Sequence, residues 1–139
     1  MRASRSEFKA WLPIATRWED ADVYGHVNNV KYYAYFDTVI NEFLVRVGGL
    51  IPNSDVVVGY VVESRCNFFV PVRFPETVDL GLCVLQLSRS SVRYRIGVFG
   101  TGENTARAVG EVVHVFVDRT QNKSVEMPSE MRIALESIR

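Results

Sequence analysis

The sequence predicts an α+β fold in which a curved antiparallel sheet wraps around one long central helix. Residues 29–47 carry apolar side chains at helical spacing on nearly every side, as a buried helix does. After residue 51, long runs of alternating apolar and polar residues are joined by turn-type connections, which is typical of an antiparallel sheet. The second half shows no alternation of strands with helices, which argues against a Rossmann or α/β-barrel fold.

The first elements are a strand, a polar turn and the helix. Residues 8–17 predict the strand, and residues 19–26 are rich in turn-forming side chains. Asn28 or Asn29 can cap the start of the helix, and Gly48–Gly49 can end it. A helix over residues 29–47 is about 28 Å long, which is the width of a small domain. We therefore expect the sheet to cover it entirely.

Later segments complete the sheet. We expect strands at residues 56–70, 78–84, 92–98 and 105–117. The alternation slips at Val84–Leu85, which predicts a β-bulge, and residues 101–104 predict a hairpin connection. Residues 112–117 are apolar on both faces apart from His114, which favours packing against the helix on one side and a second subunit on the other. A short helix is expected at residues 128–138.

Composition limits the class of protein. The 139 residues fit a single domain covering 1–139, and 47% of them are hydrophobic. Sixteen basic and sixteen acidic residues give a formal net charge of zero, which argues against a nucleic-acid partner. The sequence has no long apolar run, so we expect neither a secretory signal nor a membrane span. We therefore expect a cytoplasmic protein. Cys66 and Cys83 lie far apart, which predicts no metal site and no disulfide.

The segment 17–32 is the best candidate for chemistry. It places three carboxylates, a histidine and two asparagines in a loop that leads into the helix. A helix start offers free backbone N–H groups and a positive dipole end, which suit the oxyanion formed during acyl transfer. An upstream carboxylate can attack a carbonyl or activate water. The same residue types also make ordinary capped turns, so both interpretations stay open on these residues alone.

The wider pattern resembles a known family. Asp-x-Asp-x-x-Gly-His-Val-Asn-Asn-x-x-Tyr, from Asp20 to Tyr32, is similar to the signature of the 4-hydroxybenzoyl-CoA thioesterase family of hotdog-fold proteins. The stretch 26–32 also resembles plant acyl-ACP thioesterases, which carry two such folds. The resemblance implies an acyl-CoA thioesterase that releases a free acid and CoA, with a sheet wrapped around a long helix.

The resemblance also implies roles for five residues. Asp22 falls at the position of the catalytic carboxylate, as nucleophile or as general base. Gly25 permits the close turn, and the helix-start N–H of Asn29 polarises the thioester carbonyl. His26 and Asn28 orient Asp22, the water or the acyl group. From the residues alone, Asp20 is expected to stabilise the turn or to pair with Arg17.

Binding of CoA is expected at a strand start. Arg89, Ser90 and Ser91 suit the CoA phosphates, although a solvated hairpin is an equal interpretation. No metal is expected, and no cofactor apart from CoA as part of the substrate. The family implies a homodimer, often doubled to a tetramer, with the pocket at the dimer interface. The segment Phe69-Val70-Pro71-Val72-Arg73 is similar to a strand-ending proline segment of the family. Where many relatives carry Gly-Asp after it, this chain has Pro75-Glu76-Thr77.

Other functions remain open on the sequence. The acyl group could arrive on acyl carrier protein, which would need a basic patch at the mouth of the pocket. A non-catalytic acyl-CoA binding module on the same fold is another alternative, because a fold does not fix a function. A hotdog dehydratase is disfavoured, because no His-x-x-x-Pro-Gly type motif is present.

Overall fold

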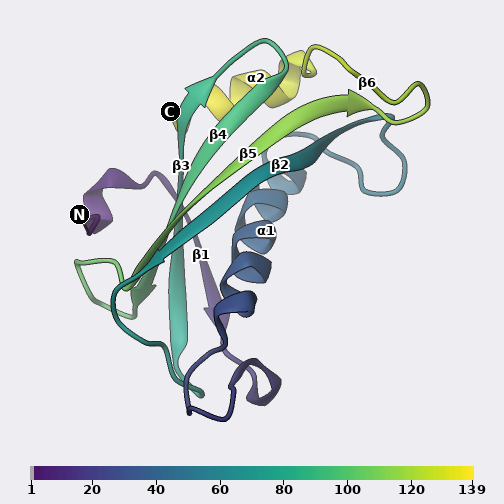
Figure 1. Cartoon of the computed structure of the whole chain (residues 1–139). Helices are drawn as coiled ribbons and strands as arrows, with labels where there is room; N and C mark the ends of the chain where they lie inside the picture. Colours follow the sequence, from purple (N-terminus) through teal and green to yellow (C-terminus); the bar gives the residue numbers. More distant parts are fainter. Residues whose placement is uncertain (1) are drawn as a thin grey trace.

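The computed structural model describes residues 2–139 and has the predicted architecture, with a curved antiparallel sheet packed around one long helix (Figure 1). The strands are β1 (Ala10–Ala15), β2 (Val57–Phe68), β3 (Thr77–Leu87), β4 (Ser91–Gly100), β5 (Ala108–Asp118) and β6 (Lys123–Ser124). The helices are α1 (Asn29–Arg46) and α2 (Ser129–Glu136), with 3-10 turns at Arg5–Glu7 and Trp18–Asp20. The main sheet has the order β1-β3-β4-β5-β2, and β6 pairs with β5.

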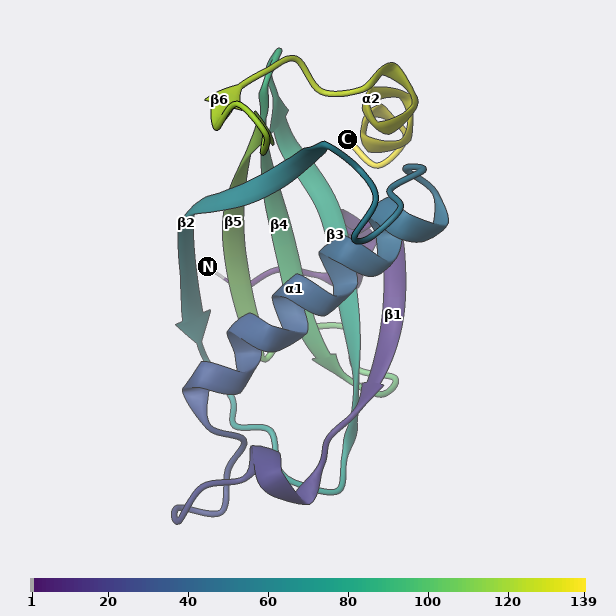
Figure 2. The ribbon, with the colours of Figure 1, turned by 90° about the vertical axis from the view of Figure 1, so that its right-hand side faces the viewer.

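The helix crosses the concave face of the sheet diagonally (Figure 2). One side of α1 is buried against the strands, through Tyr32, Tyr35, Phe36, Val39, Ile40, Phe43 and Leu44. Another stripe of the helix, with Val30 and Val45, is exposed. The expectation that the sheet of this chain covers α1 entirely is therefore wrong. The sheet of one chain curves around one side of the helix and leaves the other side open beside β2.

Strand register follows the sequence pattern. The expected bulge lies between Val84 and Gln86, where the pairing of β3 with β4 shifts. A second shift, between Val61 and Glu63 in β2, has no counterpart in the predicted pattern. The predicted strand at residues 105–117 begins later, at Ala108, because residues 101–107 form the turn from β4.

The outer face of the sheet carries a second apolar cluster that the sequence did not predict. The chain before β1 folds across this face, and Phe8 packs edge-on against Trp11 and Phe99 at ring distances of 6.1 and 5.6 Å. This cluster also buries Cys83. The N-terminal segment therefore covers part of the face that we expected to meet a second subunit.

Candidate active site

The start of α1 is capped by Asn28, one of the two residues predicted for that role. Its side-chain oxygen accepts a 3.0 Å hydrogen bond from the N–H of Val30, and its carbonyl accepts one of 2.9 Å from the N–H of Lys31. Within residues 2–139, the N–H of Asn29 has no hydrogen-bond acceptor. One donor at the positive end of the helix thus remains free to bind an incoming oxygen.

Asp22 sits in a tight turn in front of this helix start. Its carbonyl accepts a bond from Gly25 N–H at 3.1 Å, and Gly25 adopts a positive φ of 77°, as the turn requires. Tyr24 N–H donates to Oδ1 of Asp22 at 2.9 Å, and the side-chain amide of Asn28 approaches Oδ2 at 3.4 Å. Asn28 therefore links the carboxylate of Asp22 directly to the first turn of α1.

The loop that holds Asp22 is anchored by the buried carboxylate of Asp20. Tyr35, in the second turn of α1, donates to Oδ2 of Asp20 at 2.7 Å, and Arg17 N–H donates to the same oxygen at 2.9 Å. The Asp20 carbonyl accepts the N–H of Asn28 at 2.8 Å. Burial opposes ionisation of this carboxyl, but the bonds from Arg17 and Tyr35 outweigh it and hold the pKa of Asp20 below its ordinary value.

Asp22 faces an open pocket of about 500 Å³. The pocket is lined by Trp18, Ala21, Asp22, Val23, Tyr24 and Asn28. Trp18 and Tyr24 are each 80% exposed, which is unusual for large aromatic side chains. Sequence analysis did not single out these aromatic residues, although apolar side chains in an otherwise polar turn are a signal for a binding surface. The pocket offers a carboxylate, an amide and apolar walls next to a helix start.

His26 contributes through its backbone rather than its ring. Its carbonyl accepts the N–H of Asp22 at 2.9 Å, closing the turn, whereas its imidazole makes no hydrogen bond to any of residues 2–139. The structure thus brings Asp22, Gly25, His26 and Asn28 together with Asn29 at one end of α1. The ring of His26 is half-buried, and the hydrogen bonds to the Asp22 carboxylate come from Tyr24 and Asn28 rather than from this ring.

Arg89, Ser90 and Ser91 lie at the other end of the sheet. Ser91 pairs with Val115 in β5, whereas the loop carrying Asp22 lies near the start of β5 at Ala108. Seven residues of strand separate these positions by about 24 Å. Arg89 forms an ion pair with Glu126 at 3.0 Å. Within one chain, these residues are therefore not brought together with Asp22.

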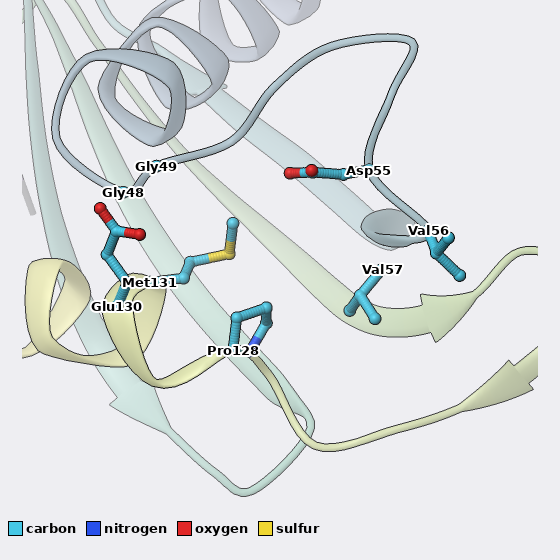
Figure 3. Close-up of a pocket in the computed structure, with 8 residues that line it drawn as sticks. All are labelled: Gly48, Gly49, Asp55, Val56, Val57, Pro128, Glu130 and Met131. Atoms are coloured by element: carbon cyan, nitrogen blue, oxygen red, sulfur yellow. The ribbon is translucent and has the colours of Figure 1, made fainter.

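A second pocket lies beyond the other end of α1 and does not belong to this site. It has a volume of about 310 Å³, and Figure 3 shows the side chains of Asp55, Glu130 and Met131 in its wall. Asp55 accepts the N–H of Ile51 at 2.9 Å and so closes its own loop. Because α1 separates the two pockets by about 27 Å, this one takes no part in chemistry at Asp22.

Residues 2–139 contain no group of three or more His, Cys, Asp or Glu side chains arranged to hold a metal ion. No helix in the same range combines the length and the apolar character needed to cross a membrane.

A sheet wrapped around a helix, with a carboxylate poised at the helix start, defines a protein of the hotdog class. The chain belongs to the thioesterase-like superfamily, whose family model matches residues 16–135. The PA5185 protein of Pseudomonas aeruginosa is 45% identical, with 100% of this chain and 97% of that chain covered and a TM-score of 0.98.

Two more distant structures share the fold. A thioesterase from Thermus thermophilus, complexed with coenzyme A and Zn, is 24% identical over 95% of both chains, with a TM-score of 0.77. The BH1999 gentisyl-coenzyme A thioesterase is 22% identical over 91% of this chain and 99% of that one, with a TM-score of 0.79.

Proposed function

We propose that this protein is an acyl-CoA thioesterase of the 4-hydroxybenzoyl-CoA thioesterase type, acting as a single domain over residues 1–139. Membership of the thioesterase-like superfamily supports thioester hydrolysis in general. One observation carries the proposal for the site: Asn28 connects the Asp22 carboxylate to a helix start where the N–H of Asn29 is free. A carboxylate that can act as nucleophile or general base thus lies at the same helix start as a free N–H donor, an arrangement that suits acyl transfer.

The reaction consumes one water and one thioester. In one route, Asp22 attacks the carbonyl carbon, the C–S bond breaks with loss of the thiolate, and water hydrolyses the resulting mixed anhydride. In the other route, Asp22 takes a proton from water, which attacks the carbonyl directly. In both, the negative oxygen of the tetrahedral intermediate is stabilised by the N–H of Asn29. Loss of one such donor in other enzymes costs about 3 kcal/mol of activation free energy.

CoA is the proposed carrier of the acyl group. The Thermus thermophilus thioesterase was solved with coenzyme A, and the BH1999 protein is named for a coenzyme A thioester, which supports CoA as the carrier here. Contact of the CoA phosphates with Arg89, Ser90 and Ser91 stays a prediction. Given the distance between these residues and Asp22 in one chain, it requires a second copy beside the pocket. A cytoplasmic location also stays a prediction; both Cys66 and Cys83 are free.

A homodimer is proposed with the unpaired edge of β2 at its interface. In the part of the chain that the structure describes, β2 pairs only with β5, so one edge of this strand is free along its 12 residues. Val61 and Val62 on β2 are exposed, as is Val30 on the open side of α1. The free backbone groups of an unpaired apolar edge can pair with another strand. A second copy of the chain can supply an identical β2 edge by two-fold symmetry. A tetramer would double this dimer.

The test is thiol release from a panel of acyl-CoAs, with the Asp22→Asn variant beside the wild type. The panel spans short and long aliphatic, benzoyl and phenylacetyl groups. We expect turnover by the wild type and a loss of about 100-fold or more in folded Asp22→Asn. Asp55→Asn, which changes a carboxylate at the other end of α1, should retain activity. Equal activity in Asp22→Asn and wild type would place the chemistry on another residue.

The same panel separates the alternatives. Turnover only of thioesters on acyl carrier protein would replace CoA with that carrier. Binding of acyl-CoA without turnover of any thioester would indicate a non-catalytic binding module.

A further inference from the structure

Glu76 holds the loop between β2 and β3 through hydrogen bonds and an ion pair. Both carboxylate oxygens of Glu76 contact the guanidinium of Arg107, at 2.9 and 3.0 Å, and one also accepts the N–H of Arg73 at 2.8 Å. The Glu76 carbonyl accepts two bonds from Thr16, one from its N–H and one from its hydroxyl. Glu76 therefore fastens this loop to the turn before β5 and to the end of β1.

The same loop supports the backbone of the candidate active site. The carbonyl of Val72, which is fully buried, accepts the N–H of Val27 at 2.7 Å. Val27 forms an antiparallel bridge with Ala21, and the turn that carries Asp22 lies between these two residues. Asn28 follows Val27 directly. If the loop moves at Val72, the hydrogen bond from Val27 therefore moves the backbone at the end of the turn that carries Asp22.

We propose that Glu76, held by Arg107, is a positioning residue that sets the place of Asp22 relative to the start of α1. The inference rests on the proposed function for its effect on rate, but its structural claim can be measured separately. The Arg107 side chain is only 12% exposed and that of Glu76 is 35% exposed, so the bidentate pair is fixed in geometry and partly shielded from solvent. Catalytic geometry is sensitive to displacements of about 1 Å, which can cost about 100-fold in rate.

Glu103 provides a matched comparison. Its carboxylate also binds Arg107, at 2.6 and 3.0 Å, but it belongs to the turn between β4 and β5 and makes no bond to residues 71–76. Loss of Glu103 removes an ion pair from the same guanidinium and leaves the bonds of Glu76 in place. If this cluster only stabilised the fold, the loss of either glutamate should lower kcat to the same extent.

The first experiment compares kcat and thermal unfolding for Glu76→Ala, Glu103→Ala and Glu76→Gln. We expect Glu76→Ala to lower kcat by about tenfold or more. Glu103→Ala should lose similar stability and keep kcat within about twofold. Glu76→Gln should restore most of kcat, because its amide oxygen still accepts hydrogen bonds from Arg107 and Arg73. Equal losses of kcat in Glu76→Ala and Glu103→Ala, or no rescue by Gln, would overturn the proposal.

The second experiment measures hydrogen exchange at the Val27 amide and does not depend on activity. We expect exchange to accelerate by about tenfold or more in Glu76→Ala and to stay at the wild-type rate in Glu103→Ala. Unchanged protection of Val27 in Glu76→Ala would overturn the positioning role even if the enzyme is active. If no thioester is hydrolysed by the wild type, the proposed function fails, and the positioning role is decided by exchange alone.

Discussion

Tyr35 donates a 2.7 Å hydrogen bond to Asp20 across the boundary between the active-site loop and α1. Asp20 is only 2% exposed, and one of its carboxylate oxygens finds no hydrogen-bond partner among residues 2–139. Burial and the neighbouring carboxylate both raise the pKa of Tyr35, so the phenol keeps its proton and acts as the donor. The pair ties the loop to the helix and thereby fixes the backbone that leads to Asn28.

Tyr35→Phe should destabilise the protein by about 2 kcal/mol, because it removes a donor from a buried, ionised carboxylate. Urea unfolding measures this loss as a lower midpoint with an unchanged slope. Tyr24→Phe removes a hydroxyl from an exposed side chain and should change the free energy of unfolding by less than about 0.5 kcal/mol. Equal stability of Tyr35→Phe and wild type would mean that the bond is not maintained in solution.

Asn28 has two functions that different substitutions can separate. Asn28→Ser keeps a good capping residue but loses the amide that approaches Asp22, so stability should hold and activity should fall about tenfold or more. Asn28→Ala loses the cap as well and should cost about 1 kcal/mol in addition. Thioester hydrolysis and unfolding, measured on both variants, check this. Full activity in Asn28→Ser would remove Asn28 from the orientation of Asp22.

Two glycines with the same backbone conformation allow strain and function to be compared. Gly25 and Gly102 have φ values of 77° and 76°, and a Cβ at either position would meet no close contact. Alanine at either should therefore cost about 1 kcal/mol of stability. Only Gly25→Ala alters the turn that holds Asp22, so only that variant should lose activity beyond its loss of folded protein. Equal activities at equal folded fractions would contradict this assignment.

His114 should make the stability of the protein sensitive to acid. It is buried on β5 in a T-shaped ring contact with Tyr94, its Nδ1 finds no hydrogen-bond partner among residues 2–139, and burial lowers its pKa to about 4. The unfolded chain has the ordinary pKa near 6.5 and so binds more protons between pH 6.5 and 4. The free energy of unfolding should therefore fall as pH falls through this range, by about 3 kcal/mol in total.

Urea unfolding of His114→Gln between pH 7 and pH 4 tests this, because the variant should show a shallower dependence on pH. His26→Gln, which changes the other histidine of the chain, serves as the control for the substitution itself. Identical pH profiles for His114→Gln and wild type would show that His114 is not the group responsible.

Local signals in the sequence were sufficient for most of the fold. The cap at Asn28, the helix end near Gly48 and the bulge after Val84 were all predicted, and each depends on residues close together in the chain. The turn around Asp22 belongs to the same category. Its catalytic role, in contrast, stays a prediction, since a turn and a helix cap need the same residue types whether or not they do chemistry.

Contacts between distant residues could not be predicted in the same way. Asp20 was expected to pair with Arg17 or to stabilise the turn, and it does both, but its shortest bond is to Tyr35, which lies 15 residues away. The pairing of Glu76 with Arg107 spans 31 residues. Alternation of apolar residues reports which face is buried but not which polar side chains meet, so these anchors emerge only from the fold.

The last prediction concerns the free edge of β2. Val62 is 61% exposed at the bulge in this strand, and a lysine there would place a charge in any strand pairing along the edge. We expect the wild type to be a dimer at micromolar concentration and Val62→Lys to be a monomer of unchanged fold, as measured by light scattering after gel filtration. Ile133→Lys, at a 71% exposed position on α2, should remain a dimer.

If the active pocket is completed at this interface, Val62→Lys should also lose thioesterase activity, and Ile133→Lys should keep it. A monomeric wild type would rule out the dimer, and a dimeric Val62→Lys would place the interface elsewhere.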